Sequence, residues 1–279
     1  MNRPPGAAPF ARILVPLGPG TGPARALGVA RSLAERTGAS LRVLSVIPPP
    51  GPEGPAAPTT DRLSLPPGSD VRHVRYGSVA AAVVAAAGPG TLVCMASHGA
   101  YGPARTLAGG VADDVVRTIG GPVLLVGPRA DAGALDRGGP VIACLDGPED
   151  AERVLAPARA WAGAFGVPLW RAHVVPDGPP GDRRPGGWSP LPEGPITLRV
   201  VHDRDPARGL ADLAASAGAT ALVLAGHGRR GWARVLTGSV VASTVQLSPV
   251  PVLVVPAAGR ARPPAPARAL GRPDATCPS

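Results

Sequence analysis

The sequence of 279 residues contains no lysine, and all 28 of its basic residues are arginines. A P-loop holds its phosphates with a lysine, so this class of nucleotide site is excluded. Aromatic residues make up only 3% of the chain, so a core must be built from Val, Leu, Ile and Ala. Such side chains suit buried parallel strands that pack against alanine-rich helices.

Cysteine is scarce as well. Cys94, Cys144 and Cys277 are too few for a disulfide framework. Cys94 and Cys144 lie within apolar, strand-like runs, where cysteine usually acts as a small buried side chain. We therefore expect neither to bind a metal.

The net charge of +9 suits an anionic partner, yet the basic residues are not clustered. Arg183-Arg184 and Arg229-Arg230 are the only basic doublets, and no run of five basic residues occurs. We therefore do not expect binding to nucleic acid.

Long uninterrupted apolar runs are absent too. Residues 1–9 lack the apolar core of a signal peptide. The uncharged stretches 79–96 and 235–259 are interrupted by Gly and Pro or by polar residues, so neither predicts a membrane-spanning helix. We expect a cytoplasmic protein with no membrane partner.

Glycine and proline are abundant, with 38 residues of each. Such a composition is typical of low-complexity chains, but 44% of the residues are hydrophobic and only 17% are charged, which indicates a folded protein. Much of the proline falls in residues 48–68 and 176–195, which we interpret as long loops, and in residues 258–279, which we interpret as a disordered basic tail.

The chain repeats itself. Three segments of the first half match segments of the second half in the same order, at offsets of 128 or 129: Ile13–Pro19 with Val141–Gly147, Leu92–Gly99 with Ala221–Gly228, and Gly121–Val126 with Val250–Val255. Such regularity indicates a tandem duplication. It predicts one domain over residues 10–129 and a second over residues 139–257.

Each copy alternates short apolar runs with helical patterns. In the first copy the predicted strands are 12–17, 41–47, 71–75, 91–96 and 123–126, and the helices are 23–37, 79–87 and 111–119. In the second copy the strands are 140–145, 168–175, 196–201, 220–225 and 252–255, and the helices are 150–165, 206–217 and 239–247. This alternation predicts an α/β fold with two open, mainly parallel sheets covered by helices on both faces. Pro157 predicts a kink or a late start of its helix.

The most informative segment follows the fourth strand of the second copy: Ala225-Gly226-His227-Gly228, and then Gly238-Ser239-Val240 at the start of a helix. Ligands of open α/β sheets bind at the carboxyl ends of strands. Glycines let backbone N–H groups approach an anion, and the N-terminus of a helix favours phosphate. Asp146, after the first strand, would face the same crevice. A tight turn with a helix cap is the simpler alternative for this loop.

Together these features resemble the universal stress protein family in its tandem two-domain form. Nucleotide-binding members have the pattern Gly, two residues, Gly, nine residues, Gly, then Ser or Thr. The second copy matches it with Ala225, Gly228, Gly238 and Ser239, and it matches the members' acidic residue with Asp146. The adenine-contacting Val of those members corresponds to Val174, which follows His173. The resemblance implies a Rossmann-like, HUP-type fold, strand order 3-2-1-4-5, and pairing of the two domains.

The first copy departs further from this pattern. It retains Gly99 and Gly109, whereas Gly18, Ala96 and Gly110 replace the expected Asp, Gly and Ser. We interpret it as a degenerate site.

Three hypotheses remain open at this stage. The first is a stress or signalling protein that holds ATP, with or without Mg, mainly in its second half and does not act as an enzyme. The second is an interaction module in which both sites have decayed. The third is a slow ATP hydrolase. His98 and His227 are expected to pack at strand ends rather than to act in catalysis, no tightly bound metal is expected, and homodimer formation is left open.

Overall fold

The computed structural model describes residues 8–17, 22–47, 70–75, 78–97, 110–145, 148–175, 197–226 and 239–256. The predicted loops and tail, at residues 48–68, 176–195 and 258–279, lie outside these residues.

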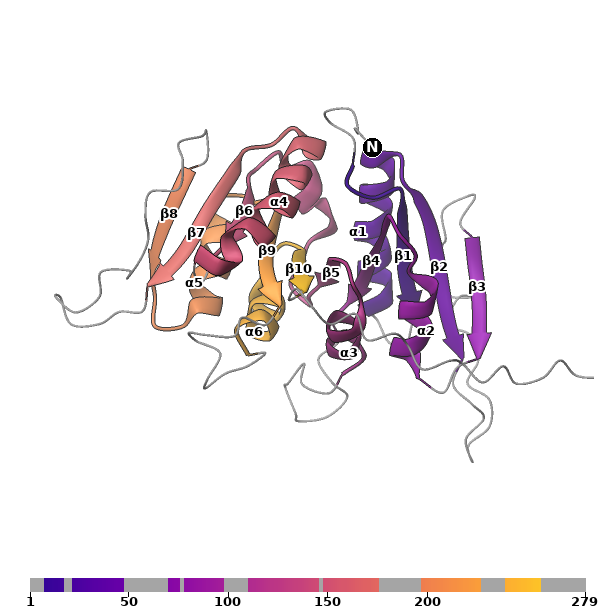
Figure 1. The fold of residues 1–279 in the computed structure, drawn as a ribbon. Helices are drawn as coiled ribbons and strands as arrows, with labels where there is room; N and C mark the ends of the chain where they lie inside the picture. Colours follow the sequence, from indigo (N-terminus) through magenta and orange to yellow (C-terminus); the bar gives the residue numbers. More distant parts are fainter. Residues whose placement is uncertain are drawn as a thin grey trace, which may run out of the picture.

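The first half contains five strands and three helices among the described residues, each close to its predicted position (Figure 1). They are β1 (Arg12–Leu17), α1 (Gly22–Thr37), β2 (Ser40–Ile47), β3 (Asp70–Arg75), α2 (Val79–Ala86), β4 (Thr91–Ala96), α3 (Val111–Thr118) and β5 (Val123–Val126).

The second half follows the same pattern. A short 3-10 helix, η2 (Ala132–Asp136), precedes β6 (Val141–Cys144), α4 (Pro148–Phe165), β7 (Leu169–Val175), β8 (Thr197–His202), α5 (Pro206–Ser216), β9 (Ala221–Gly226), α6 (Ser239–Leu247) and β10 (Val252–Pro256). The predicted late start of α4 at Pro157 is wrong, because the helix begins at Pro148 and continues through Pro157.

The ten strands of the described residues form one sheet, in the order β3-β2-β1-β4-β5-β10-β9-β6-β7-β8. The predicted order is confirmed within each half, since both halves read 3-2-1-4-5 from their outer edge. The strands within a half are parallel, whereas β5 and β10 pair antiparallel across the centre. The sequence predicted two sheets, and pairing of the halves merges them into one.

The central pair shows the symmetry of the repeat. Leu124 on β5 pairs with Leu253 on β10, and the repeat offset of 129 relates these same two residues. An approximate twofold axis therefore passes through this pair, as in an isologous dimer interface.

Helices cover both faces of the sheet (Figure 1). One apolar core lies beneath α1 and α4, and the other lies beneath α2, α3, α5 and α6. The central strands are buried on both faces, which explains why their sequences are nearly continuous runs of Val, Leu and Ile rather than alternating patterns.

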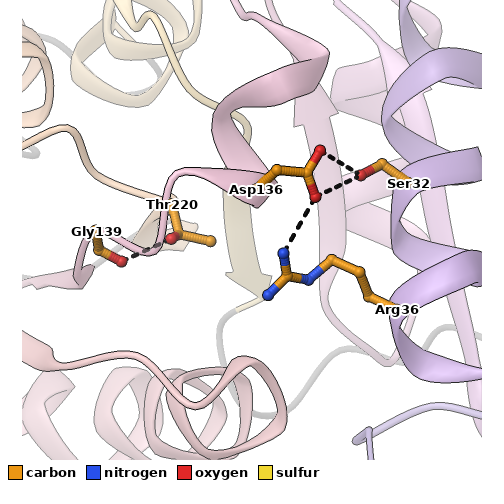
Figure 2. Close-up of polar contacts among 5 residues, drawn as sticks. All are labelled: Ser32, Arg36, Asp136, Gly139 and Thr220. Atoms are coloured by element: carbon orange, nitrogen blue, oxygen red, sulfur yellow. Dashed lines mark hydrogen bonds and ion pairs between the residues drawn. The ribbon is translucent and has the colours of Figure 1, made fainter.

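The segment between the halves is folded against both of them. The carboxylate of Asp136, at the end of η2, accepts hydrogen bonds from Ser32 and Arg36 of α1 (Figure 2). In the second half, the Thr220 hydroxyl donates to the Gly139 carbonyl at 2.6 Å. The Arg36 guanidinium also lies 5.3 Å from the centre of the Phe165 ring of α4. The first half, the connecting segment and the second half are thus held together by polar contacts as well as by the sheet.

Candidate functional site

The strand order creates a crevice in the second half. From β6 the chain runs to β7 and β8 on one side, and then returns to β9 on the other side. All of these strands are parallel, so their carboxyl ends meet at one edge of the sheet. Loops that leave neighbouring strands in opposite directions open a ligand crevice at this switch point.

The carboxyl end of β7 contributes His173 and Val174. The Nδ1 atom of His173 lies 3.0 Å from the carbonyl oxygen of Leu145, the residue after β6. A carbonyl can only accept, so Nδ1 donates, and the ring is held across the end of β6. Val174 is half-buried and points to the opposite face, against the core beneath α5. The sequence analysis predicted a role for Val174 but none for His173.

The other wall of the crevice comes from β9. Ala225 is half-buried and Gly226 is buried at the end of this strand. A Cβ atom at Gly226 would lie 3.1 Å from a methyl group of Val254 and 3.4 Å from one of Val116. Only a residue without a side chain fits at this point without displacing its neighbours.

Helix α6 connects the parallel strands β9 and β10. A helix in such a crossover runs antiparallel to the strands, so its N-terminus lies at the carboxyl edge of the sheet. Ser239 is the first residue of α6, and the following Val240 is half-buried. The first turn contains no acidic residue, so no carboxylate of that turn compensates the positive end of the helix dipole.

The structure thus brings Val174, Ala225, Ser239 and Val240 to one edge of the sheet. The other predicted site residues lie outside the described residues: Asp146, Gly228, Gly238, Gly99 and Gly109. The same holds for His98 and His227.

Comparison with known proteins identifies this half. Residues 139–256 match the universal stress protein family. The second half is thus a universal stress protein domain. Universal stress proteins of Mycobacterium tuberculosis and Mycobacterium bovis are 33% identical to it over 183 residues, which cover 58% of this chain and 61% of theirs. The matched region thus spans less than two thirds of these relatives.

Solved structures show the same fold over most of the chain. A universal stress protein from Archaeoglobus fulgidus superposes with a TM-score of 0.59 at 16% identity, over 89% of this chain and 97% of its own. A Pseudomonas aeruginosa protein of unknown function superposes with a TM-score of 0.55 at 15% identity, over 88% of this chain and 92% of its own. At these identities the likeness concerns the fold alone, and it includes both halves.

In the first half, the equivalent helix α3 begins differently. Gly110 caps α3 without a side-chain hydrogen bond. Asp113 and Asp114 lie in the first turn of α3, and Asp113 pairs with Arg117 at 2.7 Å. Carboxylates at a helix N-terminus satisfy the dipole and repel an incoming phosphate. Electrostatics therefore favour an anion at α6 over one at α3.

The carboxyl end of α6 contacts the carboxyl end of β4 in the first half. Ser97, directly after β4, is buried, and its hydroxyl accepts a hydrogen bond from the side-chain amide of Gln246 in α6 at 3.2 Å. Helix α6 therefore begins at the crevice of the second half and ends against the first half, next to Ser97.

Cys94 and Cys144 are both buried, as the sequence predicted. Burial raises the pKa of Cys144 to about 12 and raises that of Cys94 still further. Both thiols are protonated at neutral pH and are poor nucleophiles and metal ligands. Among the described residues no three His, Cys, Asp or Glu side chains form a metal-binding group. No described helix is long and apolar enough to cross a membrane.

Proposed function

We propose that this protein binds an adenine nucleotide, ATP, in the crevice of its second half, and that it acts in a stress response or in signalling as a binding protein in the cytoplasm. The observation that carries the proposal is the switch point between β6 and β9, next to a helix N-terminus that has no acidic residue in its first turn. An anion at this position gains both backbone N–H donors and the dipole of α6.

The proposed roles follow the order of the crevice. Gly228, Gly238 and Ser239 would hold the phosphates, and Asp146 would accept from the ribose or the adenine. The backbone of Val174 would meet the adenine ring, and the His173–Leu145 hydrogen bond keeps the strand ends beneath it in place. Ala225 stands where nucleotide-binding members have Gly, next to the ribose.

A catalytic role has less support. The chain has no lysine to clamp a triphosphate, and its sequence shows no obvious residue to orient a water for attack. We therefore propose binding without rapid turnover. Mg²⁺ would reach the site with the triphosphate rather than occupy a site of its own.

The test is a titration of ATP into the purified protein by calorimetry. It uses the wild type, Gly238→Val, and the equivalent change in the first copy, Gly109→Val, as the matched control. We expect the wild type and Gly109→Val to bind one ATP per chain, and Gly238→Val to bind it about tenfold more weakly or worse, because a β-branched side chain blocks the approach of the phosphate.

Three outcomes would contradict the proposal. No binding by the wild type at millimolar ATP would leave an interaction module as the better reading. Equal binding by Gly238→Val would place the site elsewhere. Steady phosphate release, well above that of a buffer control, would make the protein a slow hydrolase.

A further inference from the structure

A cavity opens at the amino ends of the first-half strands β4 and β5. Because β5 and β10 are antiparallel, the carboxyl end of β10 lies at this same edge of the sheet. Its volume is about 370 Å³. It lies where β4 begins at Thr91 and where Pro122 precedes β5, and its far wall is formed by Pro157 and Trp161 of α4. The cavity is therefore shared between the halves, because β4 and β5 belong to the first half and α4 belongs to the second.

The wall of this cavity carries no ionisable side chain. It consists of aromatic, aliphatic, proline and glycine residues, and Thr91 supplies the one side-chain hydroxyl. A phosphate or a carboxylate in such a wall would lose its hydration without gaining a counter-charge. The chemistry of the wall thus selects a neutral ligand, which distinguishes this cavity from the nucleotide crevice.

Two aromatic rings from different halves meet in the wall. Phe10, just before β1, lies 5.9 Å from Trp161 between ring centres, with the ring planes inclined at 51°. Tilted rings at this distance are in a favourable aromatic arrangement, and a third ring placed beside them gains the same kind of contact. Proline rings such as Pro157 add flat apolar surface.

Thr91 adds a hydrogen-bonding group that is not in use. Its Oγ1 atom is buried and has no hydrogen-bond partner within the described ranges. Thr220, its equivalent in the second half, donates to Gly139. A rotation about the Cα–Cβ bond of Thr91 would turn the hydroxyl toward a polar group of a ligand, which would remove the cost of a buried, unpaired oxygen.

We propose that this cavity binds a small neutral aromatic molecule of one or two rings that carries a single hydrogen-bonding group. The volume lies at the lower end of the range for small-molecule pockets. Because the ligand would contact Phe10 and Trp161 together, it would bind only when the two halves are paired, and it would stabilise that pairing. The proposal does not depend on nucleotide binding.

Two glycines in the wall allow a direct test. A Cβ atom added at Gly88 or at Gly121 meets nothing within 4 Å, and neither residue has a positive φ. A leucine at either position would therefore extend into open space without straining the backbone, and it would occupy the cavity. Gly163, exposed on α4 outside the cavity wall, also has nothing within 4 Å and serves as the matched control.

The experiment is a calorimetric titration of indole into the wild type, Gly88→Leu, Gly121→Leu and Gly163→Leu. We expect a dissociation constant of about 0.1–1 mM for the wild type and Gly163→Leu, as suits a ligand of this size. We expect a dissociation constant raised about tenfold or more for Gly88→Leu and Gly121→Leu. Indole-3-acetate, which adds a carboxylate, should bind more weakly than indole, and ATP should not displace indole.

Two results would overturn the proposal. One is the absence of indole binding by the wild type at millimolar concentrations. The other is unchanged binding by both cavity variants, which would place the indole elsewhere on the protein. Thermal unfolding of each variant shows whether it is folded, and the use of two glycines in separate loops keeps the test valid if one variant is unstable.

Discussion

The seam between the halves can be tested at Gly127, which directly follows β5. A Cβ atom at this position would lie 1.8 Å from the carbonyl oxygen of Val245 in α6 and 2.9 Å from its carbonyl carbon. Non-bonded heavy atoms prefer separations of about 3.5–4 Å, so Gly127→Ala forces the two segments apart by roughly 1 Å or more. The obstacle is backbone, which cannot rotate out of the way as a side chain can.

The size of the effect follows from this geometry. Overpacking of a well-packed interior costs about 1–3 kcal/mol, and a rigid obstacle places Gly127→Ala in the upper part of that range, at about 2–3 kcal/mol. The control is Gly163→Ala, the same substitution on the exposed face of α4, where the added methyl group meets nothing. Alanine is the better helix former there, so the control should gain about 0.5–1 kcal/mol.

The assay is urea unfolding of both variants and the wild type, followed by circular dichroism. We expect opposite shifts of the midpoint, downward for Gly127→Ala and upward for Gly163→Ala. If Gly127→Ala were as stable as the wild type, α6 would not rest against the end of β5, and the halves would not be joined as described.

Two further predictions concern single contacts. Asp136→Asn removes the charge that pairs with Arg36 at 3.1 Å. Because both side chains are partly exposed, the free energy of unfolding measured in urea should fall by no more than about 1 kcal/mol. A larger fall would mean that the connecting segment depends on this ion pair. The pKa of Cys144 rises from 9.0 to about 12 on folding, so the unfolded chain gives up this proton first, and stability should fall as the pH rises from 9 to 12. Cys144→Val should show a shallower fall over this window than the wild type, and an equal slope would show that the thiol is not buried in the folded protein.

Much of the fold could be predicted because its strands are buried on both faces. A strand such as β9, with four consecutive buried residues, reads as a short continuous apolar run. The repeat then supported each assignment twice, since every strand of one copy had a counterpart in the other.

The start of α4 was harder to predict. Pro157 suggested a kink or a late start, yet the helix begins at Pro148. At this first position the missing N–H of proline costs nothing, and its fixed φ already suits a helix. The packing of the connecting segment was not predicted either, although its Ala134 and Leu135 are fully buried. Two apolar residues in a short charged stretch give little periodicity to detect, and only tertiary contact reveals their role.

The candidate site could be predicted only in part. Motif spacing identified Ala225 and Ser239, which the structure places at the ends of their elements. The hydrogen bond from His173 to Leu145 joins residues 28 positions apart and depends on the pairing of β6 with β7, so no local pattern could reveal it. The acidic first turn of α3 could be seen in the sequence, because Asp113-Asp114 lies near the start of the predicted helix 111–119.

The two halves form a single sheet because each half alone would expose an unprotected edge strand. With the order 3-2-1-4-5, the fifth strand of each copy would be an edge, and β5 contains only Val and Leu, with no charge, proline or bulge to protect it. An exposed apolar edge of this kind pairs readily with another strand.

The apolar run alone does not fix the register, because neighbouring registers of Val and Leu bury nearly the same surface. The connection between the halves supplies the missing constraint, since the backbone N–H of Asp131 donates to the Pro249 carbonyl at 3.0 Å, just before β10 begins. The segment that leaves β5 is thereby tied to the segment that enters β10, which favours the antiparallel register that pairs Leu124 with Leu253.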